Sequence, residues 1–387
     1  QEPSLHTRTA LVMPARNEDP ERIMSGLESM LRSLSATGQV EAFDLHLLSD
    51  TGPELAEEEE SAWRRLRRNS LDPSRLHYRR RSGNEGRKAG NIAAFLETDG
   101  DDYDFFVVLD ADSVMGGETL VELVRTMEAN PSVGLIQTVP IPYGQQTLFG
   151  RFLQFAAALY SPLLAAGQSF WQTDTANYWG HNAIVRARPF HEHCGLPVLP
   201  GRPPLGGEIL SHDFVEAALL RRAGWQCYLL SQFGGSYEEV PANVLDYARR
   251  DRRWAQGSLQ HLKLLREPGI AGLNRMHFGL GAMGYLSSVL WLLILLASTA
   301  YVLVPGMSAH GLGGVMTDSA NWSLGSWRAL LPLLALTAIV LFAPKVLGLV
   351  LGLIRERREF GGALRFLVSG LLEAAFAVVV APLMMFF

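Results

Sequence analysis

Apolar and polar positions follow two different periods along the first part of the chain. Short apolar runs predict buried strands at residues 9–13, 44–49, 75–78, 104–109 and 133–139. Between them, apolar positions at helical spacing predict helices at residues 20–34, 55–68, 88–97 and 118–128. This order predicts an α/β fold with a doubly wound, mostly parallel sheet, whose ligands bind beyond the carboxyl ends of the strands.

The pattern changes at Phe278. Residues 278–304 carry no charged side chain, residues 329–354 carry only Lys345, and residues 366–387 carry only Glu373. Each run is long enough to cross a hydrocarbon core, which needs about 20 helical residues. We therefore expect three transmembrane helices, with Glu373 either lining a conduit or held by a partner.

The arginines between these runs predict the orientation. Connector 305–327 has no Lys or Arg, whereas connector 355–365 has four arginines. By the positive-inside tendency, the first connector faces outward and the N-terminal part lies in the cytoplasm. The chain starts at Gln1 without Met and stops inside an apolar run, so we expect a piece of a longer protein, truncated at both ends.

Composition excludes several classes of protein. The residues before Phe278 contain 28 basic and 35 acidic side chains, and the whole chain has a net charge of −5, which argues against a nucleic-acid partner. Cys194 and Cys227 form no CxxC pair, so neither a disulfide framework nor a zinc finger is supported. We interpret His191 and His193, beside Cys194, as loop residues rather than zinc ligands, because no fourth ligand is evident.

Several amphipathic features have two interpretations. Residues 148–160 and 244–265 each combine an apolar stripe with polar or basic side chains, which fits a helix in the membrane interface or an ordinary core helix. We expect Trp171 and Trp179 to be buried in the core. The acidic run 57–60 is expected to form a solvated helix face, in which Glu60 and Arg64 are spaced to pair.

Acidic side chains follow three of the predicted strands. Glu18 follows the first strand, Asp50 the second, and Asp110 and Asp112 the fourth. In extended backbone, residues i and i+2 point the same way, so Asp110 and Asp112 are expected to hold one hard cation. Each acid taken singly also fits a turn or a helix cap. Together with Lys88, whose alternative is a surface lysine at a helix start, they indicate a site for a nucleotide diphosphate.

Asp213 begins an apolar helical stretch, so it is either the N-cap of that helix or a functional carboxylate. We expect His212 to shape the surroundings of Asp213 rather than to act as the base itself.

Five motifs occur in the order found in the processive, membrane-embedded family-2 glycosyltransferases, which include cellulose and hyaluronan synthases. With Asp50 between the first and the second, they are Pro14-Ala15-Arg16-Asn17-Glu18, Lys88-Ala89-Gly90-Asn91, Asp110-Ala111-Asp112, Ser211-His212-Asp213 and Arg250-Asp251-Arg252-Arg253-Trp254. The chain resembles these enzymes from residue 8 to about residue 260 and in the membrane segments that follow. It is most similar to the branch that builds the β-1,2-linked backbone of osmoregulated periplasmic glucans in Gram-negative bacteria. The family's Gln-x-x-Arg-Trp box begins with arginine here, as in that branch.

The resemblance implies a nucleotide-sugar-binding, family A type glycosyltransferase fold with Asp213 as the catalytic base. The residues that it implies for binding the nucleotide sugar are Glu18, Asp50, Lys88, Asp110 and Arg253, with Asp110 and Asp112 holding its metal. The residues that it implies for binding the acceptor are His181, Asn182, Arg250 and Trp254.

We therefore expect an inverting, processive enzyme that transfers glucose from UDP-glucose to a growing β-glucan and exports it, with Mg²⁺ or Mn²⁺ as cofactor. Attack assisted by a single base predicts inversion, because no second carboxylate acts as nucleophile. One alternative is a transferase that glycosylates a membrane lipid once. Another is a transporter or channel regulated by nucleotide, which would need no base at Asp213.

The expected organisation is a cytoplasmic glycosyltransferase domain at residues 1–240, interfacial helices at 241–277 and transmembrane helices at 278–387, with 148–170 as a further candidate interfacial helix. The expected location is the bacterial inner membrane, crossed several times. The lipid bilayer and a glucan acceptor are the expected partners. The resemblance alone adds acyl carrier protein and a periplasmic glucan-processing protein.

Overall fold

The computed structural model describes residues 3–70, 72–303, 324–355, 357–358 and 360–384. The chain divides into two compact units. Unit 1 comprises Gln1–Ala157 and Ala165–Leu280, and unit 2 comprises Ala158–Leu164 and Gly281–Phe387.

Unit 1 is built on a seven-stranded sheet in the order β3-β2-β1-β4-β8-β6-β9. Its strands are β1 (Thr9–Ala15), β2 (Phe43–Ser49), β3 (Leu76–Arg80), β4 (Phe105–Val108), β6 (Val133–Thr138), β8 (Ala183–Arg186) and β9 (Gln226–Leu230). β8 runs antiparallel to both of its neighbours, and the other neighbouring pairs are parallel. The five predicted strands correspond to β1, β2, β3, β4 and β6. A second sheet, in the order β5-β10-β7, was not predicted and consists of β5 (Val114–Met115), β10 (Ser236–Glu238) and β7 (Ile141–Pro142).

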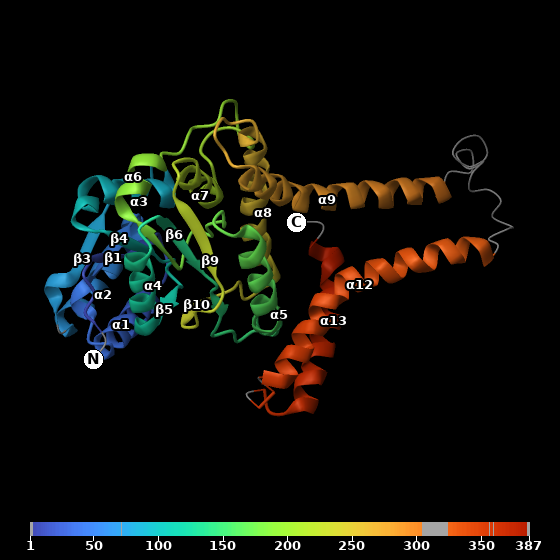
Figure 1. Ribbon diagram of the computed structural model, residues 1–387, viewed down its shortest axis with the longest axis horizontal. Coiled ribbons are helices and arrows are strands. Elements are labelled where there is room, and N and C mark those ends of the chain that lie inside the picture. The colour runs from blue at the N-terminus through green and yellow to red at the C-terminus, as the bar shows by residue number, and fades with distance from the viewer. Residues whose placement is uncertain (1–2, 71, 304–323, 356, 359, 385–387) are drawn as a thin grey trace. The chain divides into compact units, whose positions relative to one another are not determined.

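Helices cover both faces of the large sheet (Figure 1). Along β1, Leu11 and Met13 belong to a core with α1 (Pro20–Ala36), α2 (Pro53–Asn69) and α4 (Gly117–Ala129). The alternate residues Ala10 and Val12 belong to a core with α3 (Arg87–Thr98), α6 (Ala187–His193) and α7 (His212–Arg222). Successive side chains of a strand point to opposite faces, so a strand covered on both sides is apolar throughout. The doubly wound, mostly parallel fold is confirmed.

The acidic run on α2 is only partly a solvated face. Glu60 pairs with Arg64 at 2.5 Å, as predicted. Glu59, however, is fully buried and accepts hydrogen bonds from the Thr51 hydroxyl at 2.6 Å and the Tyr78 hydroxyl at 2.8 Å. Glu59 lies in line with the buried apolar stripe of α2. The prediction that the whole run 57–60 faces solvent is therefore wrong at this residue.

Four described helices are long and apolar enough to cross a membrane, so the chain is membrane-associated. They are α5 (Leu148–Gln172), α9 (Gly272–Leu303), α12 (Leu324–Arg355) and α13 (Ala363–Met384). The last three correspond to the three predicted transmembrane runs, and α5 is longer than its amphipathic start predicted. Most of connector 305–327, on which the orientation depends, lies outside the described residues. Residues 244–265 form α8 (Val244–Gln260) and a short 3-10 helix.

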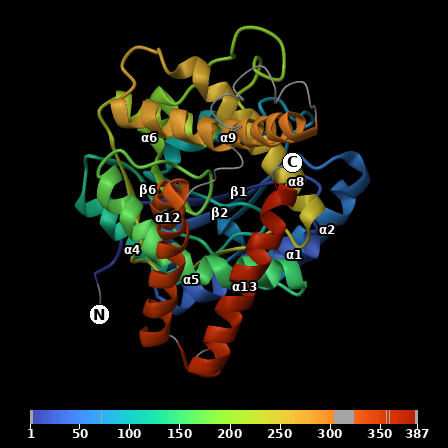
Figure 2. The same cartoon turned by 90° about the vertical axis from the view of Figure 1, so that its right-hand side faces the viewer.

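Within unit 2, α12 and α13 lie side by side as a hairpin (Figure 2). Polar side chains meet between these two helices and residue 160. Glu373 of α13 accepts hydrogen bonds from Lys345 of α12 at 2.8 and 3.0 Å and from the Tyr160 hydroxyl at 2.6 Å. Its side chain is 5% exposed. Of the two interpretations of Glu373, the structure supports the carboxylate held by partners.

We expect Glu373→Gln to destabilise unit 2 by about 3 kcal/mol, because removing one partner of a buried ion pair leaves the other charge uncompensated. The double variant Lys345→Met/Glu373→Gln removes both charges and keeps an acceptor for Tyr160, so it should recover most of the loss. Chemical unfolding in detergent micelles measures both. Equal destabilisation of the single and the double variant would show that the ion pair is not the cause.

Candidate active site

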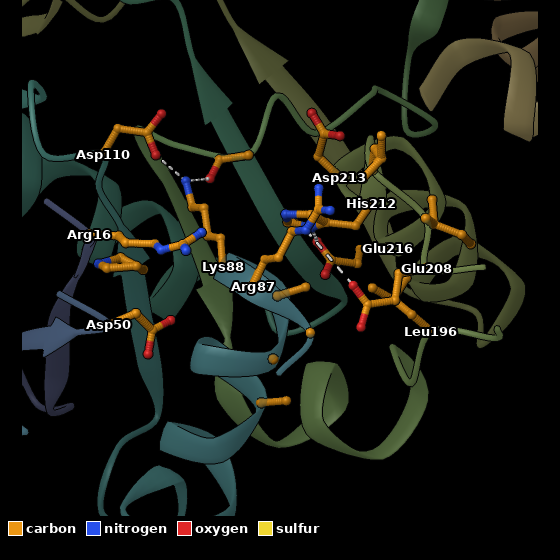
Figure 3. Close-up of a pocket in the computed structure, with 18 of the residues that line it drawn as sticks. Arg16, Asp50, Arg87, Lys88, Asp110, Leu196, Glu208, His212, Asp213 and Glu216 are labelled. Carbon is orange, nitrogen blue, oxygen red and sulfur yellow. Dashed lines mark hydrogen bonds and ion pairs between the residues drawn. The ribbon is translucent and has the colours of Figure 1, made fainter. Parts of the chain in front are cut away.

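The carboxyl ends of β1, β2 and β4 open into a cavity of about 1250 Å³ in unit 1, called the main cavity below (Figure 3). The predicted site residues that line it are Glu18, Asp50, Lys88, Asp110, Asp112, Asp213, Arg253 and Trp254. They come from three strand ends and from the starts or faces of α3, α7 and α8. Pockets for one small molecule usually measure roughly 300–1,000 Å³, so this cavity has room for a donor and the end of an acceptor.

The Asp110–Asp112 motif forms a turn rather than the extended segment we predicted. The Ser113 amide donates to the Asp110 carbonyl at 2.9 Å, and the Asp110 amide donates to the Ser113 hydroxyl at 3.0 Å. The pleat of β4 ends at Val108, so the alternation of side chains does not extend to the two acids. Both carboxylates nevertheless reach the main cavity.

Lys88 is held at the start of α3 by a backbone that requires glycine. A side chain at Gly90 would place its Cβ 2.2 Å from the Glu85 carbonyl oxygen, and Gly86 has a positive φ of 64°. The Lys88 ammonium donates to the Asp110 carboxylate and, at 2.8 Å, to the Gly180 carbonyl. The surface-lysine alternative is therefore wrong, because Lys88 points into the main cavity.

The two acids of the turn differ in their electrostatics. Burial alone would raise the pKa of Asp110, but Lys88, His181 and Arg253 outweigh it and lower that pKa to about 2. Burial and the neighbouring Asp110 raise the pKa of Asp112. No side chain in the described ranges forms an ion pair with Asp112. Negative charge at this turn is therefore only partly compensated by the protein.

This donor set fits a magnesium or manganese ion. No group of three or more His, Cys, Asp and Glu residues that could hold a metal occurs in the part of the chain that the structure describes. Mg²⁺, however, is usually held by one or two carboxylates together with substrate phosphates and water. Asp110 and Asp112 supply the two carboxylates, and the incompletely compensated charge of Asp112 favours a cation beside them.

Asp50 is held by an arginine that the sequence analysis missed. Both Asp50 oxygens accept from the Arg81 guanidinium, at 2.8 and 2.7 Å, and the Asp50 side chain is 4% exposed. Arg81 follows β3, the strand beside β2. A run of three arginines at the end of a predicted strand was the available signal, since it supplies cations at the sheet edge where the acids lie.

Asp213 lies in the first turn of α7 and is not its N-cap. Ser211 occupies the N-cap position, and its hydroxyl donates to Asp213 at 3.2 Å. A Cβ added at Gly180 would lie 3.6 Å from the Asp213 carboxylate, and the Gly180 carbonyl accepts from Lys88. Asp213 therefore lies beside the same turn that contacts Lys88, and Figure 3 shows it in the cavity with Asp110 and Lys88.

A largely buried His–Glu pair lies next to Asp213, and both of its residues also line the main cavity. The His212 Nδ1 atom is 3.0 Å from a Glu216 carboxylate oxygen, and the two side chains are 13% and 4% exposed. Burial lowers the pKa of His212, but Glu216 outweighs it and the net shift is upward. The sequence indicated His212 as a shaper of this environment, and it missed Glu216, one helical turn later.

The His212–Glu216 pair predicts a pH dependence of stability. The pKa of His212 is higher in the folded than in the unfolded protein. The pair therefore stabilises the fold fully below the unfolded-state pKa of about 6.5, and this stabilisation is lost as the pH rises through the folded-state pKa. Glu216→Gln removes the cause of the upward shift. We expect wild type to melt above the variant at pH 6, and the gap in Tm to narrow by pH 9. A gap that does not change with pH would contradict the charged pair.

Trp254 and Arg250 form a stack on α8. The Arg250 guanidinium lies over the Trp254 ring, 4.6 Å from its centroid, and over the Tyr247 ring at 5.7 Å. Trp254 is 42% exposed and lines the main cavity, whereas Arg250 does not line it. Arg250 is thus placed to orient the Trp254 indole rather than to contact an acceptor in this cavity.

Two residues implied for the acceptor lie elsewhere. Asn182 is fully buried, and its amide donates to the Ser236 hydroxyl at 2.9 Å and the Tyr237 carbonyl at 3.1 Å, so direct acceptor binding by Asn182 is wrong. His181 does not line the main cavity and lies 3.4 Å from Glu238. These residues fasten the loop before β8 to β10.

The tryptophans and the histidine cluster also differ from expectation. Trp171 is 40% exposed, and Trp179 lies on the wall of the main cavity, so neither is a core residue. His191 and His193 lie in the last turn of α6, which is a helix rather than a loop.

Comparison with known proteins agrees with this geometry. The model of the family described as "Glycosyl transferase family group 2" matches residues 105–351, and that of "Glycosyl transferase family 2" matches residues 10–194.

The chain is similar to two proteins named glucans biosynthesis glucosyltransferase H. It is 46% identical to that of Xylella fastidiosa (strain 9a5c), covering 99% of this chain and 61% of the relative. It is 44% identical to that of Xanthomonas campestris pv. campestris (strain B100), covering 99% of this chain and 60% of the relative. The chain thus spans about three fifths of the length of these relatives. The crystal structure of S. aureus TarS 1-349 aligns with a TM-score of 0.41 and 12% identity, covering 71% of this chain and 70% of that one.

Proposed function

Because the chain belongs to glycosyl transferase family group 2, we propose that it transfers glucose from UDP-glucose to the end of a growing β-glucan. The observation that supports this proposal most strongly is the arrangement of charges in the main cavity. The cations and the pair of carboxylates, which suit a diphosphate, line the same cavity as Asp213. Asp213 is an acid suited to an acceptor hydroxyl.

The leaving-group side is built from Lys88, Arg253 and the two acids of the turn. When the sugar departs, negative charge grows on the nucleoside diphosphate, and cations already in place stabilise it without reorganisation. Lys88 and Arg253 supply two such charges. A divalent ion held by Asp110 and Asp112 would add Lewis-acid stabilisation of the phosphate oxygens.

The acceptor side is built around Asp213. Its carboxylate takes the proton from the attacking hydroxyl, while the sugar carbon bonds to that oxygen and the bond to the diphosphate breaks. A positioned base contributes about 10²–10⁴ in rate. A single displacement inverts the configuration, so an α-linked donor gives a β-linked product.

The membrane helices support a polymer product that is exported as it grows. The relatives' names support a glucan product, and the family resemblance adds the β-1,2 linkage. In this proposal the catalytic unit is cytoplasmic, and the helices cross a bacterial inner membrane. Acyl carrier protein and a periplasmic glucan-processing protein remain proposed partners.

Linkage analysis of the product made from radiolabelled UDP-glucose tests the proposal. The purified chain in lipid vesicles with Mg²⁺ should yield β-1,2-linked glucan of many residues. A lipid carrying one glucose would support the single-step transferase instead. No turnover of UDP-glucose by a folded protein that binds UDP would point to a nucleotide-regulated transporter.

A further inference from the structure

A second cavity of about 520 Å³ opens beside the main cavity. Only Arg252 and Arg253 of its lining belong to a motif of the sequence, and Arg87 and Arg249 lie outside the motifs. Its charged lining consists of Arg87, Arg249, Arg252, Arg253 and Glu208, and we call it the arginine cavity. Arg87, Arg253 and Glu208 also line the main cavity, so the two are neighbours with a shared wall.

One face of α8 supplies most of the arginine cavity. Arg249, Arg252, Arg253 and Gln256 are spaced by three, one and three residues, which places them on the same side of a helix. The Gln256 amide donates to the Pro204 carbonyl at 3.0 Å. This bond fixes the arginine face against the loop that carries Gly206 and Gly207, which form the opposite wall.

The arginine cavity has an excess of positive charge. Glu208 lies 3.9 Å from Arg87, with both side chains more than half exposed, and such pairs compensate charge weakly. Arg249 pairs with Asp246 at 3.0 Å, and these side chains too are more than half exposed. Arg252 forms no ion pair with another residue in the described ranges. Four guanidinium groups are thus accompanied by two carboxylates, both in exposed pairs, and the remaining positive charge favours an anion between them.

Guanidinium groups match phosphate oxygens in geometry as well as in charge, since each presents a planar fork of donors. We propose that the arginine cavity binds a phosphate-bearing anion that is distinct from the sugar donor. The phosphate comes either from a soluble phosphate ester or from the headgroup of an anionic phospholipid. Because Arg253 faces both cavities, occupation of the two is coupled, and each ligand changes the affinity for the other by the same factor.

The test uses the full chain, saturating UDP and inorganic pyrophosphate as the probe in isothermal titration calorimetry. Wild type should bind pyrophosphate while UDP occupies the main cavity. Arg249→Gln/Arg252→Gln should weaken this binding at least tenfold, because two of the four guanidinium groups are lost. The matched control Arg67→Gln/Arg68→Gln removes two arginines of α2 and should bind as wild type does.

Equal pyrophosphate binding by wild type and by Arg249→Gln/Arg252→Gln would overturn the proposal. UDP binding is therefore titrated first in each protein. Wild type that binds no UDP would contradict the proposed function, whereas wild type that binds UDP but no pyrophosphate would contradict the second site alone. Vesicles of phosphatidylcholine, with or without phosphatidylglycerol, distinguish the sources. If phosphatidylglycerol vesicles displace pyrophosphate from wild type, the ligand is a headgroup; if they do not, it is a soluble ester. Equal displacement from Arg249→Gln/Arg252→Gln would also overturn the site.

Discussion

Asp213→Asn should bind UDP as tightly as wild type while transfer from UDP-glucose falls by about 10²–10⁴, the contribution of a positioned base. This loss corresponds to roughly 3–5 kcal/mol of transition-state stabilisation. The amide keeps the shape of the side chain and its contact with Ser211, but it cannot take a proton from the acceptor hydroxyl. Steady-state rates and calorimetric UDP affinity measure the two quantities separately.

Glu97→Gln is the matched control for Asp213→Asn. Glu97 also lines the main cavity, and it is exposed on α3. The same carboxylate-to-amide change there should leave the rate within about twofold, as for most exposed sites. Full turnover by Asp213→Asn would remove Asp213 from the role of base. Loss of UDP binding together with transfer would assign it to the donor side.

Asp112→Asn should lower transfer by about 10² or more and raise the Mg²⁺ concentration needed for half-maximal rate. The variant keeps the size of the side chain but leaves Asp110, already paired with Lys88, as the only carboxylate of the turn. Loss of a residue that only holds a metal ligand in place typically lowers metal affinity or activity about 10–100-fold. Loss of a direct ligand should lower them at least as much. Rates across a Mg²⁺ titration, and UDP binding with and without Mg²⁺, provide the readout.

Asp101→Asn serves as the control for Asp112→Asn, because Asp101 is exposed and does not line either cavity. Its Mg²⁺ dependence should match wild type. If Asp112→Asn needed no more Mg²⁺ than wild type, the turn would not be the cation site, and Lys88 and Arg253 would have to stabilise the leaving group without it.

The elements of the fold were predictable where local periodicity was strong. The strands ending near Ala15, Ser49 and Val108 are buried on both faces, and the apolar runs show this directly. The membrane helices were predictable because lipid requires long uncharged runs. The small sheet was missed because strands of two or three residues have no period to detect.

The candidate site was predictable in its residue types and only partly in its contacts. Asp110 and Lys88 were assigned to one ligand from their motifs, and the structure joins them across 22 residues. Asn182 was misassigned because a motif does not show which way a side chain points. Its amide is used by Ser236, 54 residues away, in a strand too short to predict.

Sequence alone was enough to reveal the α/β pattern, the apolar membrane runs and the acids at strand ends. These features depend only on residues that are close together in the sequence. Which charges meet depends on strand order and loop paths. Arg81 reaches Asp50 because β3 lies beside β2. Glu59 is buried because α2 packs against the sheet. Arg253 faces two cavities because α8 borders the loop before α7. Contacts of this kind join residues far apart in the chain, and no local spacing encodes them.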